Sequence, residues 1–291
     1  MKPLQWMIAL AAIMYGTWSA KSMARETCAQ HLSAADALVH VPVTLVSGRV
    51  YVYAAVNGRG PYRFAVDTGA SGVGRVDASL VTALGLPVGR GATSSDALTT
   101  STVDTTQLNT LTLGGLTRRN VEVITRDYRS RVSKEAAFDG ILARDFFADG
   151  VLVIDYRRRE LWFGRSWHVA TDDAQALPYE RAFRVPVTID GRSFEAQLDT
   201  GADVELVVPK ALWPQLTDAP LASAGQASLT NGKVGTERGV LHGPVRVGAL
   251  TLSDVNARVI EGFPEVVLGS AALRNARIMI DPRSRALAVC P

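Results

Sequence analysis

The triplet Asp-Thr-Gly occurs twice in this chain, each time directly after a short apolar segment. The first copy is Asp67-Thr68-Gly69 and the second is Asp199-Thr200-Gly201. The duplication of a strand that ends in a carboxylate predicts two similar units. These units would bring the two carboxylates together. Two carboxylates in contact cannot both ionise easily. Such a pair therefore keeps one proton and provides a general acid and a general base at one site.

Four further landmarks repeat in the same order around the triplets. They are Val41–Leu45 with Val185–Ile189, Leu111–Leu116 with Val245–Leu250, Ile141–Ala143 with Val267–Gly269, and Val153–Arg157 with Met279–Arg283. The repeated runs are short, rich in β-branched residues and separated by Gly, Pro, Asn and Asp, which is typical of strands with tight turns. The repeat therefore predicts a mainly β fold with two similar lobes and few short helices. One such helix is expected between a cap at Asp77 and a stop at Gly85.

The chain is expected to divide into five parts. These are a signal peptide at 1–24, an N-terminal extension at 25–40, a first lobe at 41–168, a linker at 169–179 and a second lobe at 180–291. A basic start, a short apolar core and small residues describe a secretory signal, which predicts an exported, periplasmic or secreted protein. Cleavage fits after Ala20 or Ala24, and Ala24 follows the better small-x-small pattern. The alternative is an uncleaved anchor, for which the apolar stretch is short.

Only two cysteines occur, Cys28 and Cys290. An even count in an exported protein favours a disulfide, and two unrelated free thiols are the alternative. The net charge of +3 is a mild bias without a broad basic patch, so we expect no nucleic-acid partner. The four histidines show no metal-ligand spacing, and we expect neither a metal nor a cofactor.

The energy of repulsion between two facing carboxylates determines how they titrate. Two negative charges about 4 Å apart repel by roughly 4 kcal/mol at an effective dielectric of about 20. That energy separates the two ionisations by roughly three pKa units. The ionised carboxylate can then take a proton from a bound water, while the neutral one hydrogen-bonds a substrate carbonyl. The proton belongs to the pair and is assigned to neither residue from sequence.

The segments Ala65–Ser71 and Gln197–Asp203 resemble the catalytic loops of retropepsin-like aspartic proteases. Ile141–Ala143 and Val267–Gly269 stand where that family has a second apolar-apolar-Gly element behind the loop. The family works as a dimer with one aspartate from each protomer. The resemblance therefore implies two β-barrel lobes related by a pseudo-twofold axis in a monomeric pseudo-dimer.

The resemblance also implies roles for residues of this chain. Asp67 and Asp199 would be the catalytic pair of an aspartic endopeptidase, and its substrate would be a peptide or an unfolded protein. Thr68, Gly69, Thr200 and Gly201 would support the loops, and Ala70, Ser71, Ala202 and Asp203 are candidate substrate contacts. Flaps are expected within Gly89–Thr106 and Ala222–Gly239, where ordinary surface hairpins are the alternative.

Further expectations concern departures from the family and the chain ends. Ala143 replaces the usual glycine, and its methyl group is expected to crowd the first loop. Asp203 matches a residue that contacts substrate backbone and pairs with an arginine in retroviral enzymes, although a local ion pair is the alternative. Because terminal strands of the family share an interface sheet, the strand near Val41 and the strand Arg285–Val289 are expected to lie near each other. A Cys28–Cys290 disulfide is expected to fasten these ends.

A second function stays open on the sequence alone. The chain would then be a non-catalytic peptide-binding or assembly module that keeps the fold, because the triplets also provide hydrogen bonds between lobes. We favour activity, since a purely structural role gives little reason to bury two facing carboxylates.

Overall fold

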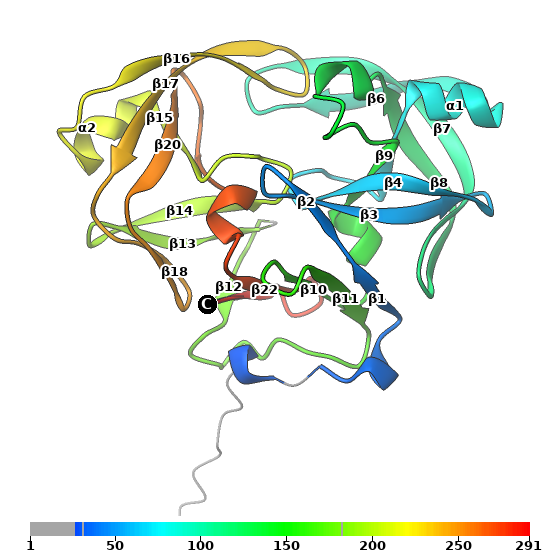
Figure 1. Ribbon diagram of the computed structural model, residues 1–291, viewed down its shortest axis with the longest axis horizontal. Coiled ribbons are helices and arrows are strands. Elements are labelled where there is room, and N and C mark those ends of the chain that lie inside the picture. Colours follow the sequence, from blue (N-terminus) through cyan, green and yellow to red (C-terminus); the bar gives the residue numbers. More distant parts are fainter. Residues whose placement is uncertain (1–26, 31, 182) are drawn as a thin grey trace, which may run out of the picture.

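The computed structural model describes residues 27–30, 32–181 and 183–291, so the expected signal peptide lies outside the described residues. Figure 1 shows two β-lobes side by side above a shared sheet, with the first lobe on the right. The fold is mainly β, as the repeat predicts. Within the described ranges, no helix has the length and apolar character needed to cross a membrane.

The first lobe is an eight-stranded sheet in the order β2-β3-β4-β9-β5-β8-β7-β6, and an additional pairing of β3 with β7 curls it on itself. Its strands are β2 (Thr44–Val46), β3 (Arg49–Val56), β4 (Arg59–Asp67), β5 (Gly74–Asp77), β6 (Val88–Ser95), β7 (Thr100–Leu113), β8 (Leu116–Arg126) and β9 (Gly140–Ala143).

The second lobe is a nine-stranded sheet in the order β16-β17-β20-β15-β21-β14-β13-β18-β19. Its strands are β13 (Arg184–Ile189), β14 (Arg192–Asp199), β15 (Leu206–Pro209), β16 (Ala222–Ser228), β17 (Lys233–Leu241), β18 (Val245–Val247), β19 (Leu250–Leu252), β20 (Val255–Ile260) and β21 (Val266–Gly269).

The two lobes repeat the same strand crossing behind each triplet. Strand β4 runs parallel to β9 with Asp67 opposite Ala143, and β14 runs parallel to β21 with Asp199 opposite Gly269. In each lobe the strand that follows the triplet pairs antiparallel with the opposite edge of the same partner strand: β5 pairs with β9, and β15 pairs with β21. The crossing fixes both triplets at matching places in their lobes.

A six-stranded sheet joins the lobes in the order β1-β11-β10-β22-β23-β12. Its strands are β1 (Val39–Pro42), β10 (Val151–Asp155), β11 (Glu160–Gly164), β12 (Leu177–Pro178), β22 (Arg277–Asp281) and β23 (Ala286–Cys290). The pseudo-twofold relation passes between β10 and β22, because each half of the sheet contains an N-terminal strand of its lobe and a C-terminal hairpin. Both terminal strands lie in this one sheet, as the resemblance implies, but they do not pair with each other. Strand β1 pairs with β11 of its own lobe, and β23 pairs with β22 and β12.

The helices are short, and α1 lies where the sequence predicts it. Helix α1 (Ala78–Leu84) begins where the Asp77 carboxylate accepts the Ser79 N–H, and it ends at Gly85 in the left-handed conformation. The other helical segments are α2 (Trp213–Leu216) and the 3-10 turns η1 (Thr27–Ala29), η2 (Ala34–Asp36), η3 (Arg129–Arg131), η4 (Arg144–Phe147), η5 (Lys210–Leu212) and η6 (Ser270–Leu273).

One apolar core runs through both lobes and the joining sheet. It includes Val50 and Phe64 of the first lobe, Ile154 of the joining sheet and Leu198 and Leu268 of the second lobe, all less than 1% exposed. Because burial of apolar area is the main favourable term in folding, this continuous core stabilises the packing of the two lobes against each other. The lobes are therefore held in a fixed relation at the level of the triplets.

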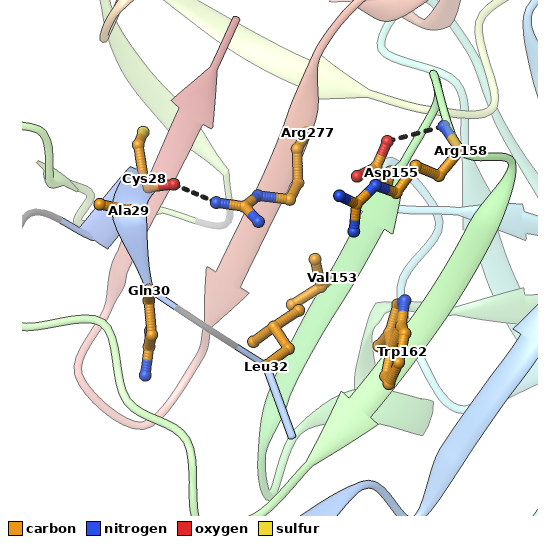
Figure 2. Close-up of a pocket in the computed structure, with 9 residues that line it drawn as sticks. All are labelled: Cys28, Ala29, Gln30, Leu32, Val153, Asp155, Arg158, Trp162 and Arg277. Atoms are coloured by element: carbon orange, nitrogen blue, oxygen red, sulfur yellow. Dashed lines mark hydrogen bonds between the residues drawn. The ribbon is translucent and has the colours of Figure 1, made fainter. Parts of the chain in front are cut away.

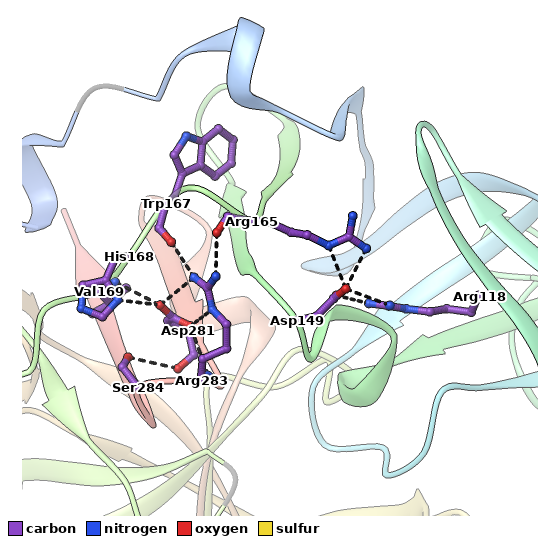
Figure 3. Close-up of polar contacts among 9 residues, drawn as sticks. All are labelled: Arg118, Asp149, Arg165, Trp167, His168, Val169, Asp281, Arg283 and Ser284. Atoms are coloured by element: carbon purple, nitrogen blue, oxygen red, sulfur yellow. Dashed lines mark hydrogen bonds and ion pairs between the residues drawn. The ribbon is translucent and has the colours of Figure 1, made fainter.

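Polar contacts add to this connection on the side of the linker. Figure 3 shows the Arg283 guanidinium bound to Asp281 and donating to the carbonyl oxygens of Arg165 (2.6 Å) and Trp167 (2.5 Å). His168 Nδ1 lies 3.2 Å from the buried Asp281 carboxylate. The chain that leaves the first lobe is thus tied to the turn between β22 and β23.

The N-terminal segment crosses under the joining sheet and is closed by a disulfide between Cys28 and Cys290, as expected. Figure 2 shows that Arg277 of β22 donates to the carbonyl oxygen of Cys28 beside this bond. A cavity of about 280 Å³ opens there between the segment and the sheet, next to Val153 and Trp162. It lies among these residues of the joining sheet and includes neither triplet in its lining.

We expect the disulfide to contribute about 2–4 kcal/mol to the free energy of unfolding, because it links residues 262 positions apart in the unfolded chain. Urea unfolding of the wild-type protein should shift to lower concentration when a reductant is added. The double variant Cys28→Ser/Cys290→Ser is the control and should unfold at the lower concentration with or without reductant. An identical midpoint for oxidised and reduced wild type would contradict this account.

Candidate active site

The two triplets meet at the centre of the molecule through reciprocal hydrogen bonds. The Thr68 hydroxyl donates to the carbonyl oxygen of Leu198 (3.0 Å), and the Thr200 hydroxyl donates to the carbonyl oxygen of Val66 (2.8 Å). Each hydroxyl also accepts the backbone N–H of the other threonine, at 3.1 and 3.0 Å. Both threonines are buried, so these four bonds replace water at the junction of the lobes.

This junction places each carboxylate against the glycine of the opposite loop. A methyl group built on Gly69 would lie 2.5 Å from Cγ of Asp199, and one built on Gly201 would overlap Cγ of Asp67 in the same way. Glycine is therefore required at both positions by space, since any side chain would displace the facing carboxylate. The structure brings Asp67 and Asp199 together, as the duplicated triplet predicts.

Backbone N–H groups hold both carboxylates in place. Asp67 Oδ1 accepts the N–H of Ala70 (2.9 Å), and Asp199 Oδ1 accepts the N–H of Gly201 (2.8 Å). Burial raises the pKa of Asp199 to about 7, and the facing Asp67 carboxylate adds to the increase against the Gly201 hydrogen bond and the Arg49 charge. The arrangement therefore favours a state in which the pair holds one proton between its two carboxylates.

The two loops differ in the residues after the triplets. Asp203 of the second loop lies 3.9 Å from the Arg49 guanidinium of β3, which also donates to the carbonyl oxygen of Gly201 at 2.6 Å. The partner of Asp203 is therefore an arginine of the other lobe, and not a local one. Ser71, the matching residue of the first loop, is exposed, and its carbonyl oxygen accepts a 3.5 Å hydrogen bond from Arg75.

Ala143 fits behind the first loop. Both loops accept the same three backbone hydrogen bonds from the segment behind them, which for the first loop come from Ala143, Arg144 and Asp145. In the second lobe a methyl group on Gly269 would overlap the carbonyl oxygen of Val204. The first lobe has Gly72 at the position that matches Val204, and its φ of +79° is one that favours glycine. This different loop backbone accommodates the methyl group that was expected to crowd it.

Two hairpins extend from the lobes toward each other and touch at their tips. They are β6–β7 and β16–β17, which cover the segments where flaps are expected (Figure 1). The Asn231 backbone N–H donates to Asp96 (2.6 Å), and its side-chain amide donates to the carbonyl oxygens of Ser94 (3.0 Å) and Thr99 (2.9 Å). Leu98 at the first tip packs against the apolar Val207, Ile260 and Val267 of the second lobe.

Sequence reasoning did not find two residues near the carboxylates. Arg49 reaches the second loop from β3, and Tyr156 lies fully buried between β10 and β11. Burial, together with the Asp199 charge, raises the pKa of Tyr156, and its hydroxyl has no hydrogen-bond partner among the described residues. Both are placed by tertiary contacts, and neither belongs to a recognisable motif. In the described part of the chain, no three His, Cys, Asp or Glu side chains group together as a metal site would require.

Two family models match the chain. The model of the aspartyl protease family covers residues 52–146, and the model described as "gag-polyprotein putative aspartyl protease" covers residues 185–275. Each match contains one triplet and the second element behind it. The chain contains two retropepsin-like aspartyl protease units. No curated protein sequence matches the chain. The two protease units account for both lobes and for the internal duplication.

We predict that Thr68→Val and Thr200→Val each lower the free energy of unfolding by about 1–3 kcal/mol, because each leaves buried N–H and carbonyl groups of the opposite loop without partners. Thr68→Ser and Thr200→Ser keep the hydroxyl and are the matched controls, with a smaller loss. Chemical unfolding monitored by tryptophan fluorescence measures the difference. If valine and serine proved equally tolerated, the junction would not depend on these hydrogen bonds.

Proposed function

We propose that the protein is an aspartic endopeptidase in which Asp67 and Asp199 together activate a water for attack on a peptide bond. The observation that supports this most strongly is the reciprocal packing of each carboxylate against the opposite glycine. Membership of both units in aspartyl protease families supports a protease-like function. A single chain supplies both carboxylates, so we propose that the protein acts as a monomer.

The proposed reaction uses the asymmetric protonation of the pair. The ionised carboxylate takes a proton from a water held between the two aspartates, and the protonated one hydrogen-bonds the substrate carbonyl oxygen. The raised pKa of Asp199 is consistent with a pair that holds one proton at the start of the reaction. The resulting tetrahedral intermediate collapses when a proton passes to the leaving amine. Thr68, Gly69, Thr200 and Gly201 keep the loops in the geometry that the pair needs.

The two hairpins are proposed as flaps that close over a bound peptide. Their tips already meet through Asn231, which is consistent with closure across both lobes. Closure would exclude water from the reacting groups. Ala70, Ser71, Ala202 and Asp203 follow the triplets and are proposed to contact the substrate backbone.

We also propose that the protein is exported, with a signal peptide at 1–24, an extension at 25–40, lobes at 41–168 and 180–291, and a linker at 169–179. The disulfide is compatible with an oxidising compartment outside the cytoplasm. The substrate is then an exported or extracellular polypeptide in an extended or unfolded state.

We expect Asp67→Asn and Asp199→Asn each to reduce kcat/KM on an unfolded protein substrate by at least about 10²–10⁴-fold, because each removes one partner of the acid–base pair. Asp172→Asn changes an exposed aspartate of the linker and is the charge-matched control, with activity unchanged. Circular dichroism shows whether the variants keep the fold.

Cleavage by both variants at the wild-type rate would rule out this pair as the catalytic group. Peptide binding by the wild type without turnover from pH 3 to pH 8 would instead support a binding or assembly module.

A further inference from the structure

Three arginines lie within electrostatic range of one tyrosine on the first-lobe side of the aspartate pair. Burial raises the pKa of Tyr128 to about 12, while the charges of Arg75, Arg126 and Arg131 lower it and that of Asp67 raises it. Burial lowers the pKa of Arg126, and the charges of Arg75 and Arg131 lower it further, while Tyr128 and Asp96 raise it. Three guanidinium groups and one carboxylate of the pair thus lie within range of the same phenol. We call Arg75, Arg126, Arg131 and Tyr128 the arginine cluster.

Among the described side chains, no carboxylate forms a direct ion pair or hydrogen bond with the arginine cluster, although the charge of Asp96 acts on Arg126 and that of Arg131 acts on Asp127 at longer range. The hydrogen bonds that the arginines of the cluster donate all go to neutral oxygens. Arg75 donates to Ser71, and Arg131 donates to Thr230. Arg126 donates to Thr230, Asn231 and Ser101. Many other arginines bind a carboxylate directly, as Arg118 and Arg283 do in Figure 3. Three like charges in a partly buried place repel one another, so an added anion would be stabilised there.

Donor groups of the cluster are unused. Arg126 Nε and the Tyr128 hydroxyl are buried and have no hydrogen-bond partner among the described residues. Arg131 is exposed and donates one N–H to the carbonyl oxygen of Thr230 (3.0 Å). Because a carboxylate accepts several hydrogen bonds and guanidinium groups bind it in a fork, these donors match a carboxylate more closely than a neutral group.

The cluster lies between the aspartate pair and the hairpin tips. Arg126 donates to Thr230 and Asn231 of the second hairpin at 2.8 Å each, so it touches the proposed flap. Tyr128 packs beside Phe138 in an apolar group that also contains Ala70, whose N–H binds Asp67. A peptide held by the pair under the hairpins would therefore pass this cluster.

The second lobe is apolar at the equivalent places. Strand β5 pairs with β8 as β15 pairs with β20, so Asp77 opposite Arg126 corresponds to Pro209 opposite Ile260. By the same register Arg75 corresponds to Val207. Ile260 and Val207 are buried in the apolar group that receives Leu98. The same backbone positions are thus cationic in one lobe and aliphatic in the other.

We propose that the arginine cluster binds a carboxylate of the peptide substrate on the first-lobe side of the scissile bond, while the second lobe takes an apolar side chain. This inference rests on the proposed peptidase site and names its substrate class. The carboxylate comes from a Glu or Asp side chain or from the C-terminus of the peptide, which present the same group. The cleavage pattern is therefore asymmetric about the scissile bond, because the two lobes have different side chains at equivalent backbone positions.

The test begins with a random octapeptide library with blocked ends, digested by the wild type and profiled by mass spectrometry. We expect Glu and Asp to be enriched at one position on one side of the cleaved bond and apolar residues on the other. In the best substrate, Glu→Gln should lower kcat/KM at least about tenfold, which corresponds to one charge-assisted hydrogen bond. If the blocked library shows no acidic preference, but a matched library with free C-termini is cleaved and its amidated counterpart is not, the terminus is the source of the carboxylate.

Arg126→Gln and Arg131→Gln should reduce the Glu-over-Gln preference to within about twofold. Arg131→Gln changes an exposed residue and keeps the result interpretable if Arg126→Gln perturbs folding. Arg119→Gln, an exposed arginine of the same strand β8 with the same change in net charge, is the control and should keep the preference. A wild type that does not distinguish acidic from amide substrates, or a preference that survives both variants, would overturn the proposal.

If the wild type cleaves nothing, the proposed function fails, and the same library then measures binding. Retention of acidic over amide peptides by the wild type, lost in Arg126→Gln and Arg131→Gln, would still support carboxylate recognition. Equal retention of both kinds of peptide would overturn it.

Discussion

The hydrogen bonds that Thr68 and Thr200 exchange across the lobes are the constraint on which the central site depends. Each hydroxyl donates to a carbonyl oxygen of the opposite loop and accepts an N–H from it. Buried donors and acceptors are costly when unpaired, so the loops are held in one relation. That relation brings each glycine against the opposite carboxylate and leaves room for no side chain there. The closeness of two like charges is thus a consequence of a neutral hydrogen-bond network.

Much of the fold could be predicted from the repeat. The strands, the two lobes and the short helix α1 with its caps follow from local patterns that the tertiary structure does not override. The order of strands in the joining sheet could not be predicted in the same way. Terminal strands of similar sequence can pair with each other or with their own lobe, and the pattern of apolar residues is the same for both. Here each pairs within its own lobe, and only β10 and β22 join the halves.

The aspartates could be predicted because the motif contains its own chemistry. Arg49, Tyr156 and the arginine cluster could not be predicted, because they lie near the site only through contacts between residues that are far apart in the sequence. Arg49 reaches Gly201 across 152 positions, and Arg126 reaches Thr230 across 104. No local periodicity encodes such contacts. The lobes show how a duplicated backbone separates two tasks: the triplets stay alike to keep the pair symmetric, while side chains at equivalent strand positions differ and make the surroundings asymmetric.

The proposed mechanism requires that Asp67 and Asp199 hold one proton together. A carbon-13 NMR titration of protein labelled at the aspartate carboxyl groups tests it directly. We expect one carboxyl to titrate near pH 7, far above the ordinary value for aspartate, and its signal to disappear in Asp199→Asn. In Asp67→Asn the same carboxyl should titrate at lower pH, because the repelling charge is gone. If every aspartate of the wild type titrated below about pH 5, the two carboxylates would be independent and the account would be contradicted.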